Sequence, residues 1–175
     1  MTDAYENGRD KGDAPHTSCG RVVRAEERDI DRILDLLLEV NNVHAAGRPD
    51  IFVKDRRKYG REEVTGLLSR EDVRIYCWRD EQDVTEGYAF CLLEETAGGG
   101  NLVPMKTFYI DDICVEESER RKHIGTALYE YARKEAAAIG CCRVTLNVWE
   151  LNPGAKAFYE KMGMKPLKTV MEEVL

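Results

Sequence analysis

The sequence predicts a mixed α/β (α+β) fold with a largely antiparallel central sheet and helices on both of its faces. β-rich runs follow one another through the middle of the chain, separated by polar or glycine-containing turns. Two later stretches carry apolar residues at helical spacing, with a strand-like run between them. An antiparallel start followed by a strand-helix-strand unit is typical of a layered sandwich of this class.

The apolar periodicity assigns the individual elements. Apolar residues recur at helical spacing from Ile30 to Leu38, with acidic residues at the favoured N-terminal end, and again four apart from Ile124 to Ala136. Asn152-Pro153 predicts the start of another helix, with an N-cap and a proline in the first position. The predicted elements are strands over 21–25, 73–78, 84–93, 107–115, 143–148 and 167–174, helices over 30–38, 62–68, 124–138 and 153–162, and a loop or broken helix over 44–59.

The length and composition are those of one globular unit. The chain has 175 residues, of which 43% are hydrophobic and 34% charged. We interpret the polar residues 1–20 as a disordered tail and residues 21–175 as a single domain. The N-terminus lacks the apolar segment of a secretory signal, and no apolar run approaches the roughly 20 residues that cross a bilayer. We therefore expect a cytoplasmic protein with no membrane contact.

Charge and cysteine usage exclude further classes. The formal net charge of -7 argues against a nucleic-acid partner and mildly favours a cationic substrate. The six cysteines form no Cys-x-x-Cys pair, and no histidine pair lies near them to complete a zinc site. We expect no bound metal, and we interpret the cysteines as small buried hydrophobic residues of a reducing compartment.

A basic turn lies between a predicted strand and the predicted helix at 124–138. At the start of a helix, unpaired backbone N–H groups and the positive end of the helix dipole favour a bound anion. Gly125 would let the backbone approach a diphosphate closely. A solvated charge run at a helix start is the alternative. The turn consists of Arg120, Arg121, Lys122, His123, Ile124, Gly125 and Thr126.

The stretch from Tyr109 to Gly163 resembles the GNAT acetyltransferase superfamily. In that family an Arg/Gln-x-x-Gly-x-Gly/Ala loop follows the fourth strand and binds the pyrophosphate of acetyl-coenzyme A, and the basic turn holds that place here. His123 stands where the family has its first glycine, so the turn must accept a Cβ atom there. A second block, from Asn152 to Met164, is similar to the family's Asn-containing loop and Phe-Tyr-Glu-Lys-x-Gly helix.

The resemblance implies an N-acetyltransferase that uses acetyl-coenzyme A as co-substrate and transfers the acetyl group directly to a primary amine in a ternary complex. It implies that Tyr159 protonates the departing thiolate, and that Asn152 and Ala155 help to line the cofactor groove. The amine acceptor is left open, as a small molecule or a protein. A homodimer is a further implication.

The resemblance also implies that the strand over 107–115 is the family's splayed fourth strand. Its backbone would bind the pantetheine arm of the cofactor as if pairing with another strand. The contacts would come from Ile113, Cys114 and Val115, and a backbone N–H near Ile113 or Cys114 would stabilise the charge that develops at the thioester carbonyl.

An ammonium acceptor must lose a proton before it attacks, which calls for a nearby carboxylate. Asp111 and Asp112 are the candidates, and because adjacent strand residues face opposite sides we expect that only one of them can serve. Both could instead simply cap or solvate the strand. Some family members carry an acid at the position near Asn147, and Glu150 is a weaker substitute here.

Several alternatives stay open. Cys114 lies near the expected thioester, but no His or Asn partner suggests an acyl-enzyme, so we favour a buried thiol. Four residues lie where the family's variable acceptor loop usually falls, and they are either candidates for the acceptor pocket or ordinary loop residues: His44, Arg48, Asp50 and Phe52. A non-catalytic acyl-coenzyme A sensor is the rival function. A nucleotide-binding domain ranks last, since neither a Walker lysine pattern nor a dinucleotide fingerprint is present.

Overall fold

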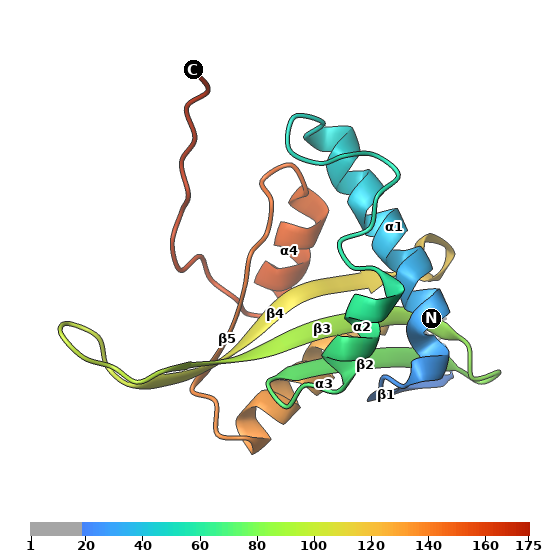
Figure 1. Ribbon diagram of the computed structural model, residues 1–175, viewed down its shortest axis with the longest axis horizontal. Helices are drawn as coiled ribbons and strands as arrows, with labels where there is room; N and C mark the ends of the chain where they lie inside the picture. Colours follow the sequence, from blue (N-terminus) through green and yellow to red (C-terminus); the bar gives the residue numbers. More distant parts are fainter. Residues whose placement is uncertain (1–18) are drawn as a thin grey trace, which may run out of the picture.

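A computed structural model, which describes residues 19–175, confirms the predicted fold class (Figure 1). Five strands form one sheet in the order β1-β2-β3-β4-β5, and all neighbours pair antiparallel except β4 and β5, which are parallel. The predicted tail falls outside the described residues, apart from its last two positions. The elements are β1 (Gly20–Arg24), η1 (Glu27–Asp29), α1 (Ile30–Gly47), α2 (Arg61–Leu68), β2 (Val73–Asp80), β3 (Thr85–Thr96), β4 (Met105–Val115), η2 (Glu117–Glu119), α3 (Ile124–Ala138), β5 (Arg143–Leu146) and α4 (Pro153–Lys161).

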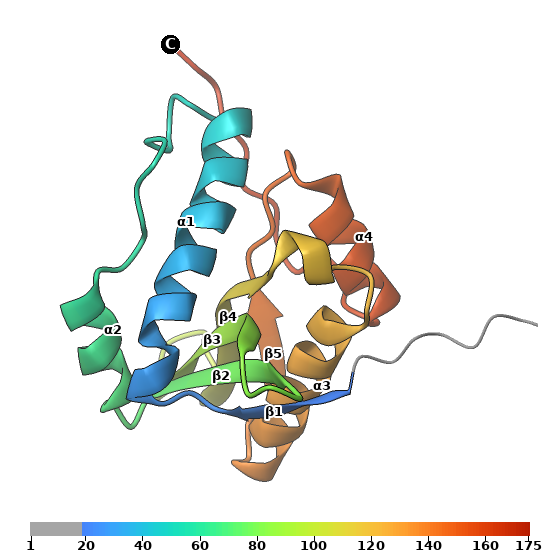
Figure 2. The ribbon, with the colours of Figure 1, turned by 90° about the vertical axis from the view of Figure 1, so that its right-hand side faces the viewer.

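Helices cover both faces of the sheet, with α1 and α2 on one side and α3 and α4 on the other (Figure 2). Each face has its own apolar core. Leu36 and Leu37 of α1 pack with Phe90 of β3, whereas Leu128 of α3 packs with Phe108 of β4 on the opposite face. Fully burying one such side chain stabilises the fold by about 1.5–3 kcal/mol, so the two clusters together hold the three layers in place. Among residues 19–175, no helix combines the length and apolar character that crossing a membrane requires.

Helix α1 is longer than the periodicity predicts. It continues to Gly47 and ends where the backbone N–H of Arg48 bonds to the carbonyl of His44 at 2.8 Å. The predicted loop or broken helix therefore begins as helix, and the irregular segment is confined to residues 48–60. Only after Gly47 does Pro49 prevent the helix from continuing.

The strand predicted over 167–174 is wrong. Residues 164–175 have no regular secondary structure, and their backbone pairs with no strand within residues 19–175. The segment leads away from the sheet in Figure 1, and Glu172 is held by two hydrogen bonds from Arg48 at the end of α1. A run with strand-like composition becomes a strand only where an open sheet edge meets it.

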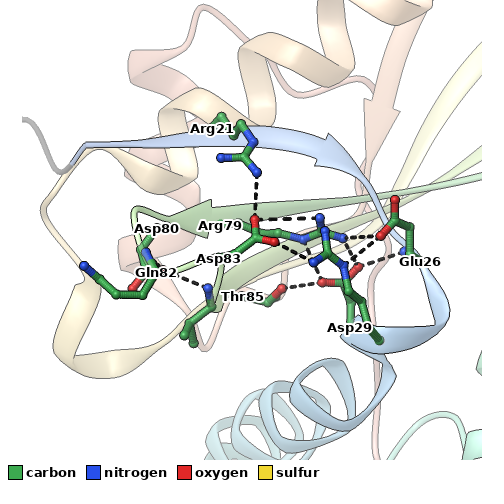
Figure 3. Close-up of polar contacts among 10 residues, drawn as sticks. Arg21, Glu26, Asp29, Arg79, Asp80, Gln82, Asp83 and Thr85 are labelled. Carbon is green, nitrogen blue, oxygen red and sulfur yellow. Dashed lines mark hydrogen bonds and ion pairs between the residues drawn. The ribbon is translucent and has the colours of Figure 1, made fainter.

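A buried ion pair ties the start of α1 to the sheet (Figure 3). Arg79 of β2 donates to both carboxylate oxygens of Asp29, at 3.0 and 2.6 Å, and both side chains are 3% exposed. Thr85 of β3 donates to the same carboxylate at 2.6 Å. Burial acts to raise the pKa of Asp29, but the hydrogen bonds from Arg79 and Thr85 outweigh it and hold that pKa below its usual value.

We expect Asp29→Ala to lower the free energy of unfolding by about 3–5 kcal/mol, because it leaves the Arg79 guanidinium buried without its main partner. The matched control is Asp31→Ala, which removes an ion pair to Arg61 in which the Asp31 side chain is 83% exposed, and it should cost far less. Urea denaturation of both variants makes the comparison. Equal losses would show that the buried pair does not anchor α1.

The depressed pKa of Asp29 also fixes the pH dependence of this difference. The stabilisation is present above the ordinary carboxyl pKa of about 4 and is lost as the pH falls through the lower folded-state value. The difference in the free energy of unfolding between the wild type and Asp29→Ala should therefore become smaller in acid.

Candidate active site

The pairing between β4 and β5 ends about halfway along β4. β4 pairs with β5 only from Thr107 to Ile110, whereas its pairing with β3 continues to Val115. Beyond Ile110, the backbone groups of β4 that point away from β3 have no partner strand within the described part of the chain. An extended ligand with amide groups could bond to this free edge as another strand would. The edge contains Ile113, Cys114 and Val115, the residues that the sequence predicts as pantetheine contacts.

A β-bulge lies at the point where the two strands part. Phe90 of β3 pairs with Asp112, and the next residue, Cys91, pairs with Ile110. Asp111 therefore has no opposite residue in β3. The extra residue turns the side chains of Asp111 and Asp112 to the same face, the one that α1 and α2 cover. The expectation that adjacent strand positions would separate these two carboxylates is therefore wrong.

Asp111 is paired with residues of the irregular segment before α2. Both of its carboxylate oxygens lie 2.7 Å from Lys58 Nζ, and the hydroxyl of Tyr59 donates to one of them at 3.0 Å. Tyr59 in turn stacks on Phe90, with ring centroids 5.6 Å apart. The Asp111 carboxylate is thus engaged by two side chains of this segment.

Asp112 lies deeper and has the character of a base that titrates near neutrality. Burial raises its pKa to about 6, and the neighbouring charge of Asp111 acts in the same direction. A hydrogen bond from the hydroxyl of Tyr88, at 2.7 Å, and the positive charge of Lys58 lower the pKa and limit the rise. A carboxylate in this range can accept a proton at neutral pH and release it again.

Tyr159 lies on α4 among aromatic rings. Its ring centroid is 5.1 Å from that of Phe158 and 6.3 Å from that of Tyr129. Burial raises the pKa of Tyr159 above its usual value, and the charge of Asp112 contributes to the rise. The phenol is therefore a proton donor at neutral pH that feels the charge of Asp112.

The basic turn leads into α3 with two residues in the left-handed region. Arg121 and His123 both have φ of +66°, and His123 is the N-cap of α3. The expectation that His123 must hold its Cβ in a glycine-like position is confirmed, at a cost of about 1–3 kcal/mol for such a residue. The first helical hydrogen bond runs from Ala127 N–H to the carbonyl of His123 at 2.9 Å, so the three preceding amides, which include that of Gly125, have no acceptor within the helix.

Within residues 19–175, the basic side chains of the turn differ in their contacts. Arg120 donates to the carbonyl of Val115 at 3.1 Å and also bonds to Glu39 of α1, so it holds the turn against the fold. Lys122 pairs with Glu119 at 2.8 Å. Arg121 is exposed and forms no side-chain hydrogen bond or ion pair with residues 19–175. Arg121 is therefore the basic side chain here that is available to an anion.

The second sequence block forms as predicted. The side-chain oxygen of Asn152 accepts a hydrogen bond from the backbone N–H of Ala155 at 3.0 Å, and Pro153 occupies the first position of α4. The cap keeps α4 beside α3, where Phe158 contacts Tyr129. The cofactor groove that the resemblance implies at Asn152 and Ala155 stays a prediction.

Aromatic rings gather where α1 ends. The ring centroid of His44 lies 5.0 Å from that of Phe52, and Trp149, from the segment after β5, lies 5.2 Å from Phe52. Two of the predicted acceptor-pocket residues are therefore brought together. The other two, Arg48 and Asp50, bond to each other at the surface.

The structure also shows the surroundings of Cys114, Glu150 and Asn147. Cys114 is 5% exposed and burial raises its pKa, as expected of a buried thiol rather than a nucleophile. Glu150 is exposed and pairs with Lys156 at 3.0 Å, while Asn147 donates to the hydroxyl of Tyr109. Within residues 19–175 no group of three His, Cys, Asp or Glu side chains is placed to hold a metal.

Four residues at or near the site were not predicted from the sequence: Lys58, Tyr59, Tyr88 and Trp149. In the sequence, Tyr88 has the pattern of an ordinary strand residue, because the alternation of residues does not indicate that its hydroxyl bonds to a carboxylate. Lys58 lies in a segment without periodicity, 53 residues from Asp111. The dense positive charge around it was the one available signal.

Comparison with known proteins gives consistent matches. Residues 37–164, more than half of the chain, match the family described as "Acetyltransferase (GNAT) family". The chain is 41% identical over 61 residues to an L-ornithine N5-acetyltransferase of Arabidopsis thaliana, a match that covers 35% of this chain and 27% of that protein. It is 26% identical over 130 residues to a glucosamine 6-phosphate N-acetyltransferase of the same plant, covering 64% of this chain and 85% of that protein.

A solved structure also shares the fold. A mutant of the BH1408 protein from Bacillus halodurans superposes with a TM-score of 0.85 at 27% identity, and the match covers 88% of this chain and 98% of that one.

Proposed function

Because the chain belongs to the GNAT acetyltransferase family, we propose that it is an N-acetyltransferase that moves an acetyl group from acetyl-coenzyme A to a primary amine, by direct attack within a ternary complex. Residues 21–175 form one acetyltransferase domain in this proposal. The L-ornithine and glucosamine 6-phosphate acetyltransferases that the chain resembles act on primary amines, which supports the acceptor class. A cytoplasmic location and a homodimer stay predictions.

One observation carries the proposal: the edge of β4 that pairs with no strand of residues 19–175 lies beside two carboxylates, and burial raises the pKa of one of them, Asp112, to about 6. The split from β5 begins at Ile110, and the bulge there turns Asp111 and Asp112 toward the same face. A thioester held along the edge would therefore have a base with a pKa of about 6, Asp112, close to its reacting end.

The residues present fit acetyl-coenzyme A, which would supply an activated thioester. The amides of Ile124, Gly125 and Thr126 together with the side chain of Arg121 suit the pyrophosphate. The free edge of β4 suits the amide-containing pantetheine arm.

The chain's own residues then manage orientation and protons. Asp112 accepts the proton that the acceptor ammonium must lose before its nitrogen forms the new C–N bond. A backbone N–H of Ile113 or Cys114 donates to the carbonyl oxygen as its negative charge develops. As the C–S bond breaks, Tyr159 donates its proton to the departing sulfur, and the second proton that the nitrogen loses as the amide forms returns to the phenolate.

The rival function is a non-catalytic sensor that binds acyl-coenzyme A. It is favoured by the absence of an acid at Asn147 and by the exposed, paired state of Glu150. An amine screen that follows thiol release from acetyl-coenzyme A, run beside calorimetric binding, separates the two. We expect thiol release with at least one primary amine. Tight binding without release across the whole screen would support the sensor and contradict the proposal.

The pKa of Asp112 predicts an acid limb in the pH profile. With an acceptor that remains an ammonium ion from pH 5 to 9, kcat/KM should fall about tenfold per pH unit below about 6, as Asp112 becomes protonated and can no longer accept the proton of the ammonium. Asp112→Asn should lower kcat on the order of 100-fold and abolish this limb. Steady-state assays between pH 5 and 9 provide the test.

Tyr159→Phe is the matched variant for this profile. It removes the proposed acid but leaves Asp112 in place, so kcat should fall while the limb near pH 6 persists. An unchanged limb in Asp112→Asn, or full turnover of a slow amine by Tyr159→Phe, would remove the respective residue from its role.

A further inference from the structure

The segment before α2 is strongly basic in an otherwise acidic chain. Five of its eight residues from 54 to 61 are basic and one is acidic, whereas the chain as a whole has a net charge of -7. Three of the basic residues have acidic partners on other elements, and Lys54 and Arg56 form no ion pair with residues 19–175. The basic residues are Lys54, Arg56, Arg57, Lys58 and Arg61.

Lys58 brings this positive charge to the proposed reaction site. Its ammonium lies 2.7 Å from both carboxylate oxygens of Asp111, the neighbour of the proposed base. The pair is asymmetric, because the Lys58 side chain is 45% exposed and the Asp111 side chain only 13%. Lys58 therefore covers the carboxylate and presents a cation to a ligand that enters from solvent.

The surroundings of Lys58 agree with this polarity. The positive charge of Lys58 lowers the pKa of His44 in addition to the larger effect of burial, so the imidazole is neutral at pH 7 and does not compete for an anion. A hollow of about 470 Å³ lies between α1 and the basic segment, and its wall includes Arg56, Arg57 and Tyr59 together with one acidic residue, Asp55. The hydroxyl of Tyr59 reaches Asp111, so the hollow and the site share a wall residue.

We propose that Lys58 binds an anionic group of the acceptor, a carboxylate or a phosphate, and so selects primary amines that carry such a group. The inference rests on the proposed function and specifies its substrate class. The ammonium of Lys58 donates to Asp111 and keeps further N–H capacity for a second acceptor. An anionic group on Lys58 would leave the amine of the same molecule near Asp112, and the neighbouring arginines would strengthen the attraction.

This assignment reverses the expectation from net charge. A charge of -7 favours a cationic acceptor only if the charges are spread evenly, and here the segment beside the site carries five basic residues and one acidic residue. The opposing arrangement would be a cationic acceptor that displaces Lys58 from Asp111, and the experiment below distinguishes it.

Two pairs of acceptors isolate the anionic group. L-Ornithine differs from 1,4-diaminobutane by a carboxylate, and glucosamine 6-phosphate differs from glucosamine by a phosphate. In the wild type, kcat/KM should be higher for the anionic member of at least one pair by about tenfold or more. The pair that shows this ratio of kcat/KM values identifies whether a carboxylate or a phosphate is bound. Raised salt concentration should reduce the ratio.

Lys58→Gln should bring that ratio close to one, while Lys58→Arg should retain most of it because the positive charge stays. The matched control is Lys106→Gln, which breaks another lysine–carboxylate pair, with Glu95 at 3.5 Å, on the β3–β4 hairpin, and it should keep the wild-type ratio. Thermal unfolding of each variant checks that the fold is intact.

The outcomes separate the inference from the function on which it rests. If other amines are acetylated but neither anionic compound exceeds its match, or if Lys58→Gln keeps the ratio, the inference is wrong and the proposed function stands. A rise in kcat/KM for 1,4-diaminobutane in Lys58→Gln with no change for ornithine would favour displacement of Lys58 and also overturn it. If no amine is acetylated, the proposed function fails and the inference fails with it.

Discussion

The candidate site depends on a local break in the regular geometry of β4. A single unpaired residue, Asp111, bulges out of the β3–β4 ladder next to the last position at which β5 still pairs. A regular strand would have placed the carboxylates of Asp111 and Asp112 on opposite faces, and continued pairing with β5 would have occupied the backbone edge. The bulge and the split together leave an open edge beside two carboxylates on one face.

The environment then gives the two carboxylates different properties. Asp111 is neutralised by Lys58 at the mouth of the site, while Asp112 is buried against Tyr88, and burial raises its pKa to about 6. The basic side chains of the turn also differ in their surroundings, because Arg120 is paired with Glu39 whereas Arg121 is exposed to solvent. Net charge alone describes neither place, because the fold decides which charges are paired and which face a ligand.

Most of the fold and the unusual backbone conformation at His123 could be predicted from the sequence. The stripe of apolar residues gives the bounds of α3, the Asn152-Pro153 pair gives the start of α4, and the motif position of His123 predicts its positive φ. The bulge could not be predicted, since the residue pattern around Asp111 is compatible with an unbroken strand. The contact between Lys58 and Asp111 spans 53 residues, and the local charge pattern around Lys58 does not identify its partner. The segment predicted as a strand over 167–174 pairs with no strand of residues 19–175.

The central claim is that the freed edge of β4 and the first amides of α3 form one binding site for coenzyme A. An amide NMR titration of the protein with coenzyme A tests this most directly. We expect the largest shifts at the amides of Ile113, Val115 and Gly125, and we expect these shifts to saturate at the same coenzyme A concentration. Binding that leaves these amides unshifted while others respond would contradict it.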